Sequence, residues 1–461
     1  MPTYDELLQE NSEQRRQIER QERRIRELEK LLEELRRGGK RQAAPFSKGE
    51  PKADPHCPGR KPGAQYGQRA SRAVPDRVDE TIEVGCPLVC GVCQGKVHLV
   101  GKKSQYQVDL PPIRTLTTEF ILHYGECSQC GRQVMGRHSR QSSQAVDAAG
   151  VQIGPEVVAL AIYLNKVGGL SYGKIANLLK QMAGLQVARS TLCRALLRAA
   201  SKSQLAYEDL VQTIRTSPVV FPDESGWRVG GRSAWLWVFT NRCETVYAIL
   251  PGRGYAEASS VLGKEYAGVI AADGWAPYQS FTQAAHQTCL AHLLRRCREM
   301  LETAKGGAAR FPLRVKEILQ AALEVRDRRT AGTLSPERVR TAKERLAAQM
   351  KRLLAGRLTY PANQRLAKHL RRHQDQLFLF LDREDVEATN WPAEQAIRPA
   401  VVNRKSCGGN RTASGAEAQA VLTSLLRTAQ QRNLNLLSVV SAIMRSPQEL
   451  AYNDLCTIQG R

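Results

Sequence analysis

The chain has 461 residues, enough for several hydrophobic cores, and carries 68 Lys and Arg against 45 Asp and Glu. The net charge of +23 favours a polyanionic partner, and we expect nucleic acid. We expect no membrane contact, because apolar runs such as "VVALAIYL" are far shorter than the ~20 residues of a spanning helix. The polar N-terminus is no signal peptide, so we expect a cytoplasmic protein whose twelve Cys bind metal or stay reduced.

Residues 1–37 predict a dimerising coiled coil because apolar residues recur with a heptad period. The a positions are Tyr4, Asn11, Ile18, Ile25 and Leu32, and the d positions are Leu7, Gln14, Gln21, Leu28 and Leu35. Ile at a with Leu at d favours two parallel helices, whereas the Arg-rich flanks leave a solvated single helix as the alternative. Residues 38–80 are rich in Gly, Pro, Lys and Arg, which predicts a linker without a hydrophobic core. The same composition also suits a basic arm that binds DNA.

Two Cys-x-x-C pairs in residues 81–140 predict a zinc ribbon. Cys90 and Cys93 form one pair, and Cys127 and Cys130 form the other, each close to a Gly and separated by the β-like run "KSQYQVDLPPI". Four thiolates on two tight turns suit one tetrahedral structural Zn²⁺. Three further residues are alternative ligands for one position, namely Cys86, His98 and His123. A chance cluster of buried thiols is the other interpretation.

Residues 150–212 predict helices, with a helix-turn-helix-like pair that we expect to bind DNA. "SYGKIANLLKQMAGLQVARSTLCRALLRAA" contains an amphipathic helix, a Gly-containing turn and a second helix that we expect Ser190 or Thr191 to cap. Arg189, Arg194 and Arg198 lie on that second helix, where they would suit a major groove or its phosphates. A helical connector without DNA contact is the alternative.

Residues 213–293 predict the first part of an RNase H-like α/β core. Four strand-like runs are "PVVFPDESGW", "SAWLWVFTN", "ETVYAIL" and "YAGVIAADGW", followed by a short strand and a helix in "HQTCLAHLLRRCREM". In that topology the first and fourth strands are neighbours, so Asp223 and Asp273 at their ends would share a cleft. Residues 294–386 predict a basic helical insertion, 387–430 the closing helix of the core, and 431–461 a helical tail. The fold class is therefore multidomain α+β.

Asp223, Asp273 and Glu394 are candidate ligands for two Mg²⁺ or Mn²⁺ ions, because hard carboxylate oxygens hold the ions that drive phosphodiester chemistry. Three basic residues after Glu394 would hold phosphate, namely Arg398, Arg404 and Lys405. On spacing alone other triads remain open, since Glu224 adjoins Asp223 and four acids precede Glu394, namely Asp382, Glu384, Asp385 and Glu387. Asn390 has three possible roles: it would orient Glu394, contact the scissile phosphate or only cap the helix. For Trp391 we favour packing in the core over stacking on an unpaired base.

The motifs "DESGWRVGG", "WLWVF", "DGWAPY", "CLAHLLRR", "ATNWPAEQAIRPAVVNRK" and "GAEAQAVLTSLLRTAQQRN" stand in this order after the two Cys pairs. Together they resemble the IS66 family of insertion-sequence transposases over essentially the whole chain. The resemblance implies a DDE transposase with Asp223, Asp273 and Glu394 as catalytic acids. "CLAH" is similar to a Cys-x-x-His element of DDE transposases with helical insertions, which implies a structural Cys289 and a catalytic candidate in His292.

The resemblance implies a bacterial, nucleoid-associated protein that cuts double-stranded DNA at the terminal inverted repeats of its own element and joins the ends to target DNA. The coiled coil adds the expectation of a homodimer. Companion proteins encoded by the element are further candidate partners. Trp275 and "KSCGGN" depart from the family's pattern and put local DNA contacts in doubt, not the acids. Two alternatives remain: a nuclease or resolvase that does not join strands, and a catalytically silent DNA-binding regulator.

Overall fold

The computed structural model describes residues 17–19, 21–22, 27, 72–150 and 152–456. The chain divides into two compact units, residues 1–109 and 110–461, and each is described by itself. The predicted coiled coil and most of the basic linker lie outside the described residues, so both stay predictions.

In the first unit, the described backbone folds locally around the first Cys pair. The N–H of Cys90 donates to the Gly95 carbonyl at 2.8 Å, and Val89 and Lys96 form an antiparallel bridge. The sequence predicts a strand over residues 103–113. This prediction is wrong, because this run has neither helix nor strand in the structure. Its side chains are exposed, so the alternating pattern has no buried face that would hold it in a sheet.

The second unit begins with a hairpin and a helical module. The hairpin consists of β1 (Tyr124–Glu126) and β2 (Gln133–Met135), which enclose the second Cys pair. The helices that follow are α2 (Asp147–Gly150), α3 (Pro155–Lys166), α4 (Tyr172–Ala183), α5 (Arg189–Lys202) and α6 (Gln204–Arg215). The predicted helix–turn–helix pair corresponds to α4 and α5, with Gly184 in the left-handed conformation at the end of α4. The predicted cap of α5 is wrong, because Ala188 is the N-cap and no side chain caps the helix.

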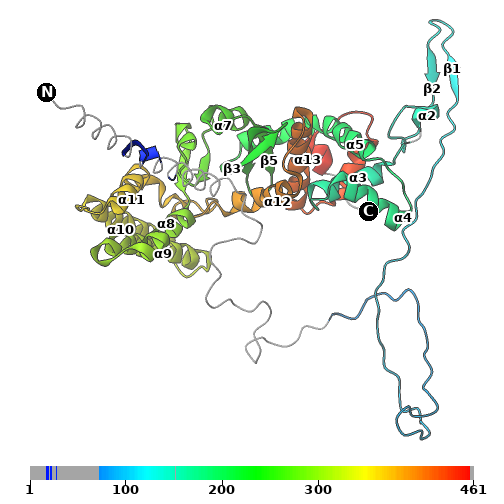
Figure 1. Ribbon diagram of the computed structural model, residues 1–461, viewed down its shortest axis with the longest axis horizontal. Coiled ribbons are helices and arrows are strands. Elements are labelled where there is room, and N and C mark those ends of the chain that lie inside the picture. The colour runs from blue at the N-terminus through cyan, green and yellow to red at the C-terminus, as the bar shows by residue number, and fades with distance from the viewer. Residues whose placement is uncertain (1–16, 20, 23–26, 28–71, 151, 457–461) are drawn as a thin grey trace, which may run out of the picture. The chain divides into compact units, whose positions relative to one another are not determined.

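A five-stranded mixed sheet follows, whose strand order is β5-β4-β3-β6-β7. Figure 1 labels its strands β3 and β5. Its strands are β3 (Val219–Val229), β4 (Arg232–Thr240), β5 (Thr245–Leu250), β6 (Val269–Ala272) and β7 (Ala285–Thr288). The first three strands pair antiparallel, whereas β6 runs parallel to β3 and β7 parallel to β6. The predicted adjacency of the first and fourth strands is therefore confirmed, through the pairs Val219–Val269 and Val220–Ile270.

Both faces of this sheet are covered by helices, because its strands are apolar on both sides. On β3, Val220 faces a core built with α3, α5, α6, α13 (Ala413–Gln431) and α14 (Leu436–Arg445). The next residue, Phe221, faces a second core built with α12 (Trp391–Cys407) and the insertion. Between β5 and β6, α7 (Tyr255–Leu262) packs on the first core. Successive residues of a strand thus serve opposite faces.

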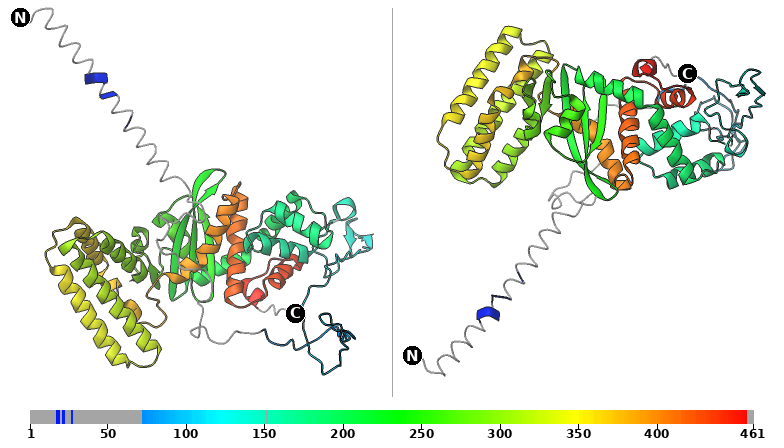
Figure 2. Two further views of the ribbon diagram at one scale, coloured as in Figure 1. Left: turned by 60° about the horizontal axis from the view of Figure 1, so that its bottom comes forward. Right: turned by 90° about the horizontal axis from the view of Figure 1, so that it is seen from above.

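The insertion between β7 and α12 is helical (Figure 2). Its side chains form most of the second core. Its helices are α8 (Leu290–Thr303), α9 (Arg310–Thr330), α10 (Pro336–Ala355) and α11 (Pro361–Arg372). Short 3-10 turns lie at Ala276–Ser280, Gly306–Ala309, Gln374–Gln376 and Leu379–Leu381, and α15 (Tyr452–Cys456) ends the described chain. The helix α8 packs on α9, and α9 on α10, so the insertion supports α8 beside the sheet edge.

Candidate active site

Asp223 and Asp273 lie on neighbouring strands and point to the same face of the sheet. Asp223 is on β3, two residues after Phe221, and Asp273 directly follows β6, two residues after Ala271. Phe221 and Ala271 both belong to the core that contains α8 and α12. Because side chains of a strand alternate between faces, both carboxylates are directed toward these two helices.

Glu394 and His292 come from those two helices and meet above the strands. Glu394 lies in the first turn of α12, and His292 lies in the first turn of α8. The His292 Nε2 atom is 3.8 Å from Glu394 Oε1, and about a third of each side chain is exposed. Four residues from two strands and two helices therefore converge on one partly exposed site, which we call the cleft.

The charges of this cleft act on one another. Burial, together with the negative charges of Glu224, Asp273 and Glu394, raises the pKa of Asp223 to about 7, against a hydrogen bond from the Glu224 N–H. The neighbouring Cys289 side chain, and then Asp273 and Glu394, raise the pKa of His292. A protonated His292 or a bound cation would relieve the repulsion among these carboxylates.

Asn390 holds the start of α12 against β3. Its Nδ2 donates to the Pro222 carbonyl at 2.8 Å, one residue before Asp223, and its backbone N–H donates to the Sγ of Cys289 at 3.1 Å. Asn390 occupies the N-cap position of α12, but its side chain makes no capping hydrogen bond. Asn390 is therefore the cap of α12 by position only, and its buried side chain bridges the elements that carry Asp223 and Glu394.

Glu224, Tyr278 and Arg253 form a network that the sequence did not single out. Glu224 points to the opposite face from Asp223, with only 3% of its side chain exposed. Its carboxylate accepts from the Tyr278 hydroxyl and from Arg253 Nε, the latter at 2.8 Å. Arg253 also lies 4.0 Å from the ring centroid of Trp275. The network joins β3 to the turn after Asp273, and the only signal for it in the sequence is the Tyr of "DGWAPY".

The insertion contributes a second residue that local patterns did not predict, His369 of α11. A Cβ atom on Gly274 would lie 3.2 Å from the His369 ring, so His369 packs beside the residue that follows Asp273. Gly274 also has φ +84°, which favours glycine. Burial and the nearby His373, Arg296 and Arg372 lower the pKa of His369 to about 4.

The donor set of this cleft fits a hard divalent cation, although the side chains do not enclose one as they stand. Asp223, Asp273 and Glu394 offer only carboxylate oxygens, which Mg²⁺ and Mn²⁺ prefer, and their mutual repulsion would fall on binding. Asp273 Oδ1 accepts from the Trp275 N–H at 2.9 Å. Within residues 72–150 and 152–456, no three His, Cys, Asp or Glu side chains lie close enough together to hold a metal.

The basic residues after Glu394 divide into two kinds. Arg404 points back to the sheet, where its Nη1 donates to Ser225 Oγ at 3.0 Å and to the Gly226 carbonyl. This guanidinium therefore fastens α12 to β3, and its contact with phosphate stays a prediction. Arg398 and Lys405 are exposed.

Trp391 is the first residue of α12 and is 59% exposed, so the prediction that it packs in the core is wrong. The physical reason is helical periodicity. The buried face of α12 is formed by Ala393, Ala396, Ile397 and Ala400, and Trp391 lies on the other side of the helix.

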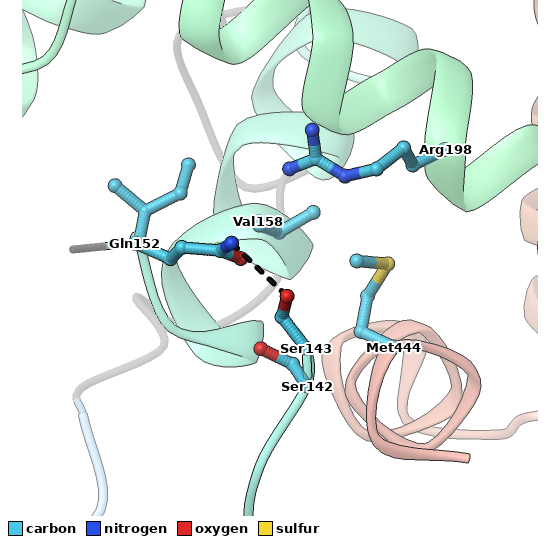
Figure 3. A pocket seen from close by; sticks show the side chains of 7 residues that line it. Ser142, Ser143, Gln152, Val158, Arg198 and Met444 are labelled. Atoms are coloured by element: carbon cyan, nitrogen blue, oxygen red, sulfur yellow. Dashed lines mark hydrogen bonds between the residues drawn. The ribbon is translucent and has the colours of Figure 1, made fainter. Parts of the chain in front are cut away.

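Arg189, Arg194 and Arg198 are exposed along α5. Arg198 also lines a small pocket of about 130 Å³ with Met444, Val158 and Ser143, in which Gln152 Nε2 donates to Ser143 Oγ at 3.0 Å (Figure 3). The pocket lies at the helical module, and no acid of the cleft lines it.

The two Cys pairs form similar turns in the two separate units. Cys127 donates its N–H to the Arg132 carbonyl at 2.9 Å and accepts from the Gly131 N–H at 2.8 Å. Hydrogen bonds from the backbone of Cys93 lower the pKa of Cys90, and those from Gln129 and then Cys130 lower the pKa of Cys127. A lowered thiol pKa favours the thiolate that zinc binds.

The family model of the IS66 transposases matches residues 150–418, which include the helical module, the sheet, the insertion and α12. The chain belongs to the IS66 family of transposases. No curated protein matches it. Among the described residues, no helix has the length and apolar character needed to cross a membrane.

Proposed function

We propose that this chain is a DDE transposase that binds the terminal inverted repeats of its own element, cuts the DNA there and joins the freed 3′-hydroxyl to target DNA. The catalytic domain is RNase H-like, and Asp223, Asp273 and Glu394 are its acids. The observation that carries the proposal is the convergence of these three acids: two neighbouring parallel strands and the first turn of α12 direct them to one cleft. The raised pKa of Asp223 supports their proximity.

The same alternation argues against Glu224 as a member of the triad, since its side chain serves the opposite face and is bonded to Tyr278 and Arg253. Two of the four acids before Glu394 have other partners, because Asp382 pairs with Lys343 and Asp385 with Arg383.

Each residue of the cleft then has a role in phosphodiester chemistry. Divalent ions bound by the three carboxylates would activate the attacking oxygen and stabilise the leaving oxygen. Asn390 sets the distance between β3 and α12, and therefore between Asp223 and Glu394. His292 orients Glu394 and, when protonated, holds a positive charge beside the developing negative charge of the phosphate.

The remaining parts of the chain supply DNA contacts and assembly. Arg189, Arg194 and Arg198 of α5 bind DNA at the ends of the element, and the net charge of +23 attracts the backbone. The Cys pairs hold one structural Zn²⁺. The coiled coil of residues 1–37 pairs two chains, so that two active sites meet two DNA ends.

Glu394→Gln tests the proposed chemistry. The substitution keeps the shape of the side chain and removes the charge that holds a divalent ion, so it should nearly abolish cleavage and joining. DNA binding should stay close to wild type, because it rests on basic residues elsewhere. The measurement maps the products from labelled element ends incubated with the purified protein and Mg²⁺.

Glu384→Gln and Glu387→Gln are matched controls, since they remove the same charge from the residues just before α12 and should be nearly silent. An active Glu394→Gln protein, with one of the controls inactive, would move the third acid to another position. Joined products separate a transposase from a resolvase, which cuts without joining, and metal-dependent cleavage separates it from a silent regulator.

A further inference from the structure

One face of α12 stays exposed along the whole helix and carries an unusual mixture of side chains. Trp391, Arg398, Val402 and Lys405 follow at spacings of seven, four and three residues, which places them on the same side of a helix. Trp391 is 59% exposed and Val402 54%, and both basic residues are exposed as well. We call these four residues the exposed stripe of α12.

The exposed stripe is not needed to pack α12. The helix already buries its opposite face, through Ala393, Ala396, Ile397 and Ala400, against the sheet and the insertion. Within the described residues 219–293 and 391–431, the large apolar side chains that are exposed are Trp275, Trp391 and Val402. An indole left in water forgoes a large hydrophobic gain on folding, which favours a ligand that covers it.

The backbone on both sides of Trp391 is held in place, so the ring is presented from a rigid base. Asn390 is anchored to Pro222 and Cys289 by two hydrogen bonds, and its carbonyl accepts from the Glu394 N–H at 3.1 Å. Pro392, the next residue of the helix, has its φ fixed by its ring. A rigidly mounted aromatic side chain loses little conformational entropy when it binds a ligand.

The position of Trp391 and the charges behind it identify the occupant. Trp391 precedes Glu394 by three residues, so the indole ring lies within one helical turn of the third acid. Arg398 lies about 10 Å along the helix from Trp391, and Lys405 about 10 Å further, because an α-helix rises 1.5 Å per residue. Two positive charges at this spacing suit a ligand with a row of negative charges, such as the phosphates of a DNA strand. Aromatic rings stack on nucleobases regardless of sequence, but a base must be unpaired to expose its face.

We propose that the exposed stripe of α12 binds one DNA strand that is unpaired beside the scissile phosphate. Trp391 stacks on the unpaired base, and Arg398 and Lys405 contact the phosphates that lead away from the acids. This inference rests on the proposed function, because it takes the cleft of Asp223, Asp273 and Glu394 as the place where DNA is cut. It adds that the enzyme opens the duplex locally at the cut.

The test uses the full chain without divalent metal, so that binding is measured apart from cleavage. The probes are a fluorescent duplex that ends in two unpaired arms and a fully paired duplex of the same strand length. Trp391→Leu, which keeps an apolar side chain but removes the ring, should weaken binding of the forked duplex on the order of tenfold, with little change for the paired one. Trp391→Phe should retain most of the affinity for the fork.

Two sets of variants serve as controls. Tyr360→Ala removes another exposed aromatic ring, at the start of α11 and outside the stripe, and should leave the preference for the fork unchanged. Arg398→Gln and Lys405→Gln should weaken binding of both probes and each lower the salt dependence by about one phosphate contact.

Equal losses on both probes, or no loss with Trp391→Leu, would overturn the stacking of Trp391. Failure of this inference is distinguishable from failure of the proposed function. A chain that cuts and joins DNA but binds the fork equally well with Trp391→Leu contradicts the stripe alone. A chain that prefers the fork through Trp391 and never cuts DNA contradicts the proposed chemistry alone.

Discussion

Asp223→Asn should stabilise the metal-free protein most above neutral pH, and progressively less as the pH falls toward the ordinary pKa of an aspartate. The pKa of this carboxyl is about 7 in the folded chain, and we take the ordinary aspartate value of 3.8 for the unfolded chain. Between these values the folded protein binds more protons than the unfolded protein, so its stability falls as the pH rises. Above pH ~7 the loss is complete, because Asp223 is ionised in both states.

The size of the effect follows from the same two values. A difference of about three units at 1.36 kcal/mol per unit gives at most about 4 kcal/mol of destabilisation by the ionised Asp223. Asparagine removes this charge while its Oδ1 still accepts the hydrogen bond from the Glu224 N–H, which is 2.8 Å long. The gain should therefore be electrostatic and depend on pH.

The assay compares the unfolding midpoints of wild type and Asp223→Asn in EDTA at about pH 5 and about pH 8. Asp375→Asn, a change at an exposed aspartate of the insertion, is the control and should have no effect at either pH. Mg²⁺ added at the higher pH should stabilise wild type more than Asp223→Asn. A variant that gains no stability at the higher pH, or gains the same at both, would refute the reasoning about the crowded carboxylates.

Three further predictions concern other parts of the chain. Arg404→Ala should lower the free energy of unfolding by about 1–3 kcal/mol, because its bonds to β3 are lost. Arg398→Ala should weaken DNA binding without lowering the free energy of unfolding. Denaturation curves and binding assays of both variants check this, and a loss of stability in Arg398→Ala but not in Arg404→Ala would contradict it. The purified protein should contain about one Zn²⁺ per chain, and Cys130→Ser should lower its folding stability; freshly prepared protein without zinc by metal analysis contradicts the ribbon. Removing residues 1–37 should leave the catalytic domain folded but monomeric and reduce the pairing of DNA ends. An unchanged number of chains per particle in solution, together with unchanged pairing of the ends, would count against the coiled coil.

Local patterns were sufficient to predict the elements of the core. The runs that became β3 to β6 are rich in β-branched and aromatic residues and bounded by Gly, Asn and Arg turns, and such runs specify strands before any tertiary contact forms. The helix α12 was predicted because Pro392 suits a first turn. The prediction of a strand at 103–113 was wrong, because an alternating pattern without a buried face does not make a strand.

By itself, then, the sequence determined the order of the elements, the adjacency of the strands that carry Asp223 and Asp273, and the family. Only the tertiary structure decided which side chains face the cleft. One step along β3 separates Asp223 from Glu224, and only the packing of helices on each face shows that Glu224 belongs to Tyr278 and Arg253.

The same holds for residues that act across long separations in the chain. The residues around Arg404 do not distinguish it from the other basic residues of α12, and only the structure shows its bonds to Ser225 and Gly226. The residues around His369 likewise do not predict that it lies beside Gly274. Trp391 was assigned to the core because large apolar side chains usually are buried. Its exposure depends on which face of α12 the sheet covers, and the contacts between distant segments, rather than the residues around Trp391, decide that.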